Sequence, residues 1–200
     1  MYLGLMVITI ALSNLQHMMI DMEYLNQENW FRKIYFPIHW FILPFFYLHV
    51  RAVLKKRGLF VKEWACLFGP VSLIFVAHFC HFIVKSQQIG ISNMPDYNEK
   101  DFLMYSNLMS FVFNGVLIFI CYRLLNFEER SDTKMSQRKL KDILWYRSFI
   151  KITVGTLSFG TISVLLIIRV GIDTSFVVYP FFLIVSIVLY YMGYEGVRRS

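Results

Sequence analysis

The sequence predicts an all-α fold, a polytopic integral membrane helix bundle with about six transmembrane helices. Hydrophobic residues make up 57% of the 200 residues and charged residues only 16%, whereas soluble domains carry about 25% charged residues because their surface faces water. Six stretches of 17–21 residues contain no Asp, Glu, Lys or Arg. A helix needs roughly 20 apolar residues to cross a bilayer, so this pattern argues against a soluble enzyme or a soluble binding domain.

With a few flanking residues, the six stretches predict one transmembrane domain with spans at approximately 1–20, 34–53, 64–84, 102–123, 150–169 and 174–194. The first span turns polar from Ser13 onward, so we expect a shortened span or the remainder of a longer N-terminal region. The second contains Pro37 and Pro44, and the third contains Pro70. Proline removes one backbone hydrogen bond and bends a helix, which neighbouring helices tolerate in a membrane.

Between the fourth and fifth spans, the sequence predicts a cytoplasmic loop at 126–147 that contains an amphipathic helix. Leu140, Ile143 and Leu144 share one helical face, while the neighbouring lysines lie elsewhere. Such a helix lies in the membrane interface with its apolar side in the lipid. We expect it to lie on the inner leaflet and to run into the fifth span.

The basic residues predict the orientation of the chain. Of the 20 Lys and Arg residues, 15 lie in the connections 51–62 and 123–151 and at the C-terminus, at 198–199. Lys and Arg concentrate in cytoplasmic loops, so both termini are expected to be cytoplasmic. The net charge of +7 is then explained by topology, and we expect this chain to contact the lipid bilayer and to make no direct nucleic-acid contact.

Histidines and amides are the candidates for chemistry, because the expected spans contain almost no charged residues. His78 and His81 are three residues apart and share a helix face. Imidazoles at this spacing can bind a metal, but a metal site needs further ligands, and we expect neither a metal ion nor a cofactor. Interhelical hydrogen bonds, or a small polar cavity that takes a small-molecule or peptide ligand, are the remaining interpretations. The cavity candidates are His17, His39, His78, His81 and Asn114.

Small residues in the fifth span predict a helix-packing face formed by Gly155, Ser158 and Gly160. Small side chains let two helices approach closely in a membrane. The partner is either another helix of the bundle or the same helix of a second copy in a homodimer. No catalytic motif occurs, so no catalytic residue is assigned and the sequence does not predict an enzyme.

Three segments resemble membrane-anchored AraC-type transcriptional regulators. The segment 41–51, FILPFFYLHVR, followed by VLKK, is similar to their GP-L-YLYV-(K/R)-SLL pattern, with Leu43 in place of the usual glycine. The segment 145–150, WYRSFI, resembles the W-L-R entry to a late span of that family. The C-terminal segment 190–199, YYMGYEGVRR, is similar to the Y-x-G-Y-x-G-L-R exit from its last span.

The resemblance implies a sensor region in a bacterial inner (cytoplasmic) membrane that precedes a cytoplasmic helix-turn-helix domain. This chain would then be a signal-input module for transcription regulation that lacks the DNA-binding domain and one N-terminal span. Its last span would pass the signal to an output domain. Two other functions stay open at this point: a small membrane transporter or membrane enzyme with a His-lined site, and a structural membrane subunit.

Overall fold

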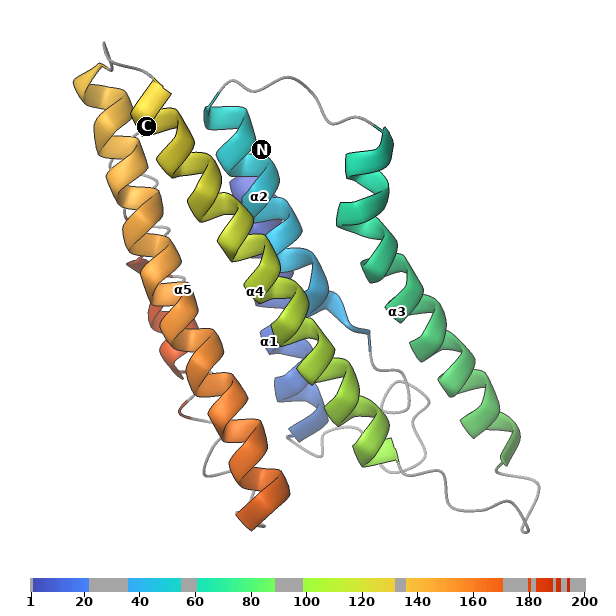
Figure 1. Ribbon diagram of the computed structural model, residues 1–200. Helices are drawn as coiled ribbons and strands as arrows, with labels where there is room; N and C mark the ends of the chain where they lie inside the picture. Colours follow the sequence, from blue (N-terminus) through green and yellow to red (C-terminus); the bar gives the residue numbers. More distant parts are fainter. Residues whose placement is uncertain are drawn as a thin grey trace. The chain divides into compact units, whose positions relative to one another are not determined.

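Every secondary-structure element described by the computed structural model is a helix (Figure 1). The described residues are 2–21, 36–54, 61–88, 99–131, 136–170, 180, 183–188, 190, 191 and 194. The elements are α1 (Tyr2–Asp21), the 3₁₀ helix η2 (Ile38–Phe41), α2 (Ile42–Val53), α3 (Val61–Gln88), α4 (Glu99–Ser131) and α5 (Gln137–Val170). The all-α prediction is therefore confirmed for this part of the chain.

The helices coincide with five of the six predicted spans, but their ends differ. α4 includes the predicted span 102–123 and continues to Ser131, and α5 begins at Gln137, well before the predicted span 150–169. Most of the predicted span 174–194 lies outside the described residues. The number of six spans stays a prediction.

Residues 126–147, where the sequence predicts a loop with an amphipathic helix, are mostly helical. Residues 126–131 form the end of α4, and residues 137–147 form the start of α5. Of the three apolar residues assigned to one face, Ile143 is buried, while Leu140 and Leu144 are exposed. The helix does run into the fifth predicted span, whereas its place on a leaflet stays a prediction.

The chain divides into two units, Met1–Ser106 and Asn107–Ser200, and α4 runs from the first into the second. In the first unit, α1 packs against η2 and α2 (Figure 1). Met6, Thr9, Ile10 and Ser13 are buried in α1, and their spacing places them on one helical face. The Thr9 hydroxyl donates a hydrogen bond of 2.7 Å to the Leu5 carbonyl, which satisfies this buried group within its own helix.

Two prolines mark the local structure of the second predicted span. Pro37 precedes the short 3₁₀ helix, and Pro44 lies in the first turn of α2. Proline is tolerated in a first turn because the amide hydrogens there have no partner within the helix. Within the predicted span 34–53, the described residues from Ile38 onward form a 3₁₀ turn followed by a 12-residue α-helix.

Aromatic rings join η2 and α2 to α3 in the first unit. The Phe41 ring lies 5.4 Å from that of Phe75, and the Phe45 ring lies 6.3 Å from that of Phe68. Arg51, in the last turn of α2, pairs with Glu63 in the first turn of α3 at 2.8 Å. These contacts set α2 and α3 antiparallel, with the ion pair at the connected ends.

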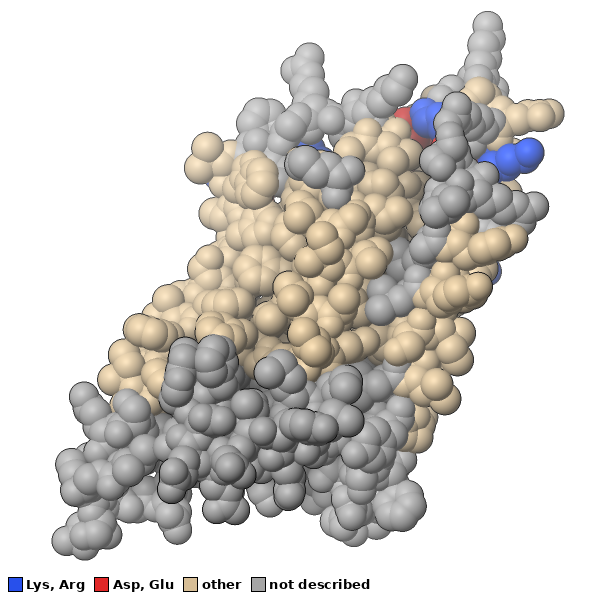
Figure 2. Space-filling view, turned by 180° about the vertical axis from the view of Figure 1, so that it is seen from behind, with Lys and Arg blue, Asp and Glu red and all other residues tan. Residues whose placement is uncertain are grey.

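Large apolar side chains remain exposed along the described helices, and Figure 2 shows a face with few Lys, Arg, Asp or Glu side chains in view. Two segments, Val61–Ile83 and Tyr105–Ser131, are long and apolar enough to cross a membrane. Only 17% of the most apolar window of the first and 33% of that of the second is buried. The helices Tyr2–Gln16 and Ile38–Val53 are apolar but shorter. Length and composition alone do not separate such helices from other apolar helices.

Candidate functional site

A buried polar cluster lies where α3 meets the first turns of α4, within the first unit. His78 of α3 is 6% exposed and Ser106 of α4 is 3% exposed. His78 Nε2 and Ser106 Oγ are 3.0 Å apart, which is hydrogen-bond distance. Because burying a polar group is costly unless it is paired, the contact fixes α3 and α4 against one another at this level.

Phe102, one turn before Ser106 in α4, brings the two neighbouring histidines together. Its ring meets the His78 ring edge-on, with the centroids 4.8 Å apart. It stacks on the His81 ring at 4.6 Å, with only 2° between the planes. His78 and His81 therefore lie on one face of α3, as their spacing predicts, and both face the start of α4.

The side chains of this cluster can form hydrogen bonds with an uncharged polar group. An imidazole can donate and accept a hydrogen bond, and a hydroxyl can do both. The same contact between a serine hydroxyl and an imidazole also occurs in enzymes that activate a serine nucleophile, which keeps Ser106 relevant to the alternative of a membrane enzyme. Among the described residues, no three His, Cys, Asp or Glu side chains are grouped closely enough to hold a metal ion.

The other cavity candidates lie elsewhere in the sequence or outside the described side chains. His39 is in η2, and its ring centroid is 6.5 Å from that of Trp40. The backbone of His17 belongs to α1, while its side chain lies outside the described part. Asn114 is buried in the second unit and donates a 3.2 Å hydrogen bond to Ser110 Oγ. Its Oδ1 is buried and accepts no hydrogen bond from the described residues.

The predicted small-residue face of α5 is divided between exposed and buried positions. Gly155 and Ser158 are exposed, whereas Gly160 is buried. A Cβ added at Gly155 would have nothing within 4 Å, so none of the described residues packs closely on that glycine. Packing of this face against a helix of a second copy stays a prediction.

Three threonine hydroxyls of α5 are satisfied within the helix itself. Thr153, Thr156 and Thr161 each donate a hydrogen bond of 2.9–3.0 Å to the carbonyl four residues earlier. This local bonding leaves these three threonine hydroxyls with no need of a donor contact to water or to another helix. An exposed helix surface with its hydroxyls bonded in this way is suited to an apolar environment.

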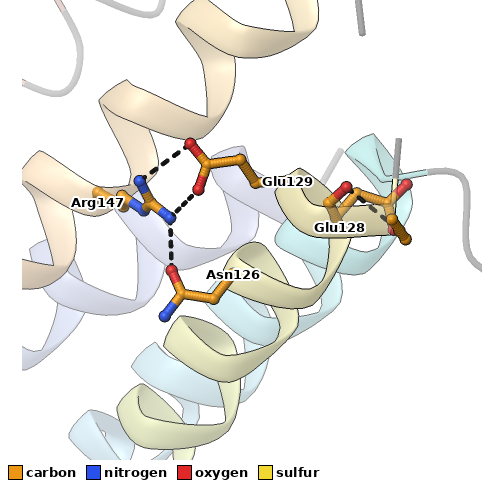
Figure 3. A network of polar contacts seen from close by, with 5 residues as sticks. Asn126, Glu128, Glu129 and Arg147 are labelled. Atoms are coloured by element: carbon orange, nitrogen blue, oxygen red, sulfur yellow. Dashed lines mark hydrogen bonds and ion pairs between the residues drawn. The ribbon is translucent and has the colours of Figure 1, made fainter. Parts of the chain in front are cut away.

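A second polar cluster joins α4 to α5 within the second unit (Figure 3). Arg147 of α5 forms a two-armed contact with Glu129 of α4, in which Nη1 donates to Oε1 at 3.4 Å and Nη2 donates to Oε2. The same Nη2 donates to Asn126 Oδ1. Planar two-armed arginine–carboxylate pairs are stronger and more directional than single contacts, so Arg147 fixes the register of the two helices.

Glu128 turns away from Arg147, as Figure 3 shows, and pairs with Lys139 at 2.9 Å. The Glu128 side chain is 11% exposed, compared with 36% for that of Glu129. Removing one partner of a buried ion pair leaves an unpaired charge, which is more costly than removing one from an exposed pair. Lys139 therefore neutralises the charge of Glu128, which lies on a side of α4 that Arg147 does not reach.

Sequence reasoning did not select Phe102 or Ser106, nor the cluster around Arg147. Ser106 is 28 residues from His78, and no local pattern connects two such positions. One signal was nevertheless present, because Ser106, Ser110 and Asn114 follow one another at steps of four residues in an otherwise apolar stretch. Such a row of polar side chains on one helix face predicts a buried contact.

Ser106→Ala is expected to lower stability by about 1–3 kcal/mol, because it leaves the buried His78 imidazole without this partner. His78→Leu is expected to lower stability by a similar amount, because it leaves the buried Ser106 hydroxyl without the imidazole. The double variant should then be more stable than the sum of the two single losses predicts. Thermal unfolding in detergent of all four proteins measures this coupling, and strictly additive losses would contradict the contact.

Comparison of the chain with protein-family models, with curated proteins and with solved structures found no match. The function is therefore argued from the residues of this chain.

Proposed function

We propose that this chain is an integral membrane helix bundle that serves as a signal-input module, with the cluster around His78 as its ligand-responsive site. The signal would pass through the last predicted span to a cytoplasmic output domain. The observation that supports this proposal most strongly is the exposure of large apolar side chains along helices long enough to cross a bilayer.

The exposed surface favours a membrane over water. In α3, Leu73 is 73% exposed and Phe79 is 63% exposed, and both lie within the segment Val61–Ile83. Soluble proteins rarely expose contiguous apolar surface beyond a few hundred Å², except where a partner covers it. The core helix of a soluble protein would have most of its apolar residues buried, whereas 17% of the apolar window of α3 is buried.

The receptor part of the proposal rests on the cluster of His78, Ser106 and Phe102 and on the resemblance to membrane-anchored AraC-type regulators. Polar side chains inside a membrane are costly and are frequently functional. A ligand that offers its own donor or acceptor would compete for the contact between His78 and Ser106. Such a ligand shifts the packing of α3 against α4 by its difference in affinity for the two arrangements.

The membrane part predicts the reactivity of Cys80, which is exposed on α3. In a variant with Cys66→Ser and Cys121→Ser, Cys80 should resist a charged, membrane-impermeant maleimide, because lipid surrounds it. After the bilayer is dissolved and the chain is denatured, the same thiol should react completely. Mass spectrometry measures the fraction of Cys80 that is labelled in intact membranes and after denaturation.

Lys62→Cys in a background without other cysteines provides the matched control, since residue 62 is exposed in the first turn of α3. This position lies in a predicted cytoplasmic connection and should react once the vesicles are opened. Rapid labelling of Cys80 in intact membranes would show that water reaches α3 within the segment Val61–Ile83, and the membrane proposal would be wrong.

The signal-input part predicts a response at the C-terminus. With a helix-turn-helix reporter fused after Ser200, His78→Phe should change the basal output at least about fivefold, which is the lower end of typical coupling between sites. Leu73→Phe, on the exposed side of the same helix, should leave the output unchanged. Equal output from the wild type and from His78→Phe at equal protein level would contradict the proposal.

A further inference from the structure

One exposed face of α4 changes from apolar to basic along its length within the second unit. Met109, Val112, Val116 and Phe119 are all more than half exposed. Arg123, Phe127 and Arg130 continue the same series and are exposed as well. The steps of three and four residues place all seven positions on one side of the helix.

The two arginines of this face are not neutralised by described residues. The Arg123 guanidinium lies over the Phe119 ring, 6.0 Å from its centroid. Among the described residues, no carboxylate lies within ion-pair distance of Arg123 or Arg130. The acidic residues of the same helix turn, Glu128 and Glu129, are paired with Lys139 and Arg147 of α5.

The contacts with α5 therefore separate the charges at the C-terminal end of α4 by face. Glu128 and Glu129 pair with α5, and the two arginines remain on the exposed side. Seven residues of helix separate Arg123 from Arg130, which is about 10 Å along the axis. Phe127 lies between them on the same face and is 65% exposed.

We propose that Arg123 and Arg130 bind the phosphate groups of anionic phospholipids, with Phe127 between them at the boundary of headgroups and chains. This inference rests on the membrane location under Proposed function and adds the class of lipid. Charge complementarity points to this occupant, because a basic segment next to an apolar helix face attracts anionic headgroups. The long stems of arginine can lie along apolar surface while the guanidinium reaches the headgroup region.

The adjoining apolar residues favour a lipid over a nucleic acid as the anion. A nucleic acid would be bound from water, and it would leave Val116 and Phe119 on the same face without an apolar partner. A phospholipid satisfies both parts of the face, since its chains cover the apolar side chains and its phosphate meets the arginines. The apolar residues from Met109 to Phe119 come before the two arginines along α4, as lipid chains come before headgroups in a leaflet.

The full chain, reconstituted in phosphatidylcholine vesicles, tests the site with spin-labelled phosphatidylglycerol and spin-labelled phosphatidylcholine. Electron paramagnetic resonance gives the relative association of the two lipids with the protein. The wild type should prefer phosphatidylglycerol. Arg123→Gln with Arg130→Gln should reduce this preference by up to about fivefold per arginine, the equivalent of about 1 kcal/mol for each basic residue.

Two variants serve as controls. Arg123→Lys with Arg130→Lys keeps the charge and should retain most of the preference. Arg32→Gln with Lys33→Gln removes the same charge from a connection predicted on the other side of the membrane and should retain it too. An equal loss in this second control would assign the preference to net charge and overturn the proposed site.

Two further outcomes separate this proposal from the proposed function. A chain that alkaline carbonate releases from the vesicles is not integral to the bilayer, and both proposals are then wrong. A chain that stays in the bilayer but shows no preference for phosphatidylglycerol contradicts the lipid site alone. Displacement of the spin-labelled phosphatidylglycerol by excess inorganic phosphate would identify a site for free phosphate and would also overturn the lipid proposal.

Discussion

The rest of the account depends on one constraint, which is that the exposed apolar faces of these helices must be removed from water. Apolar surface transferred out of water is worth about 25 cal/mol per Å², and Leu73 and Phe79 in α3, like Val112 and Val116 in α4, are all more than half exposed. In a bilayer the backbone must also bond within its own helix, and α3, α4 and α5 are long helices that do so. The hydroxyls of Thr153, Thr156 and Thr161 in α5 follow the same rule, since they donate to carbonyls of their own helix.

Polar groups are consequently placed in pairs or near helix ends. His78 and Ser106 face each other where α3 meets the start of α4. Arg51 pairs with Glu63 where α2 ends and α3 begins. Glu128 and Glu129, near the end of α4, pair with Lys139 and Arg147 of α5. Because these interactions are directional, they determine which helix faces meet, which lipid contacts alone do not specify. A ligand that competes for one of them would therefore act on the packing of two helices at once.

The central parts of the helices could be predicted from the sequence, but the residues at which they end and the contacts between them could not. The charge-free stretches at 64–84 and 102–122 overlap the two long apolar segments of the structure, Val61–Ile83 and Tyr105–Ser131. The end of α4 was missed because the predicted loop begins at residue 126, whereas Glu128 and Glu129 continue the helix and are each compensated by a residue of α5 that lies 11 or 18 positions later. The spacing of His78 and His81 predicted a shared face, and Phe102 indeed contacts both rings. Ser106 was missed because the contact joins residues that are distant in sequence.

A nitroxide scan along α4 in the reconstituted chain tests the central claim most directly. Single cysteines at positions 112, 116, 119, 127 and 130, in a background without other cysteines, would each carry the label, and collision rates with oxygen and with a water-soluble nickel chelate would be measured. Oxygen dissolves in the hydrocarbon core, whereas the chelate stays in water. The account predicts high oxygen and low chelate accessibility at 112, 116 and 119, a change near 127, and the reverse at 130. High chelate accessibility at 116 would show that water covers this face of α4, and it would contradict the account.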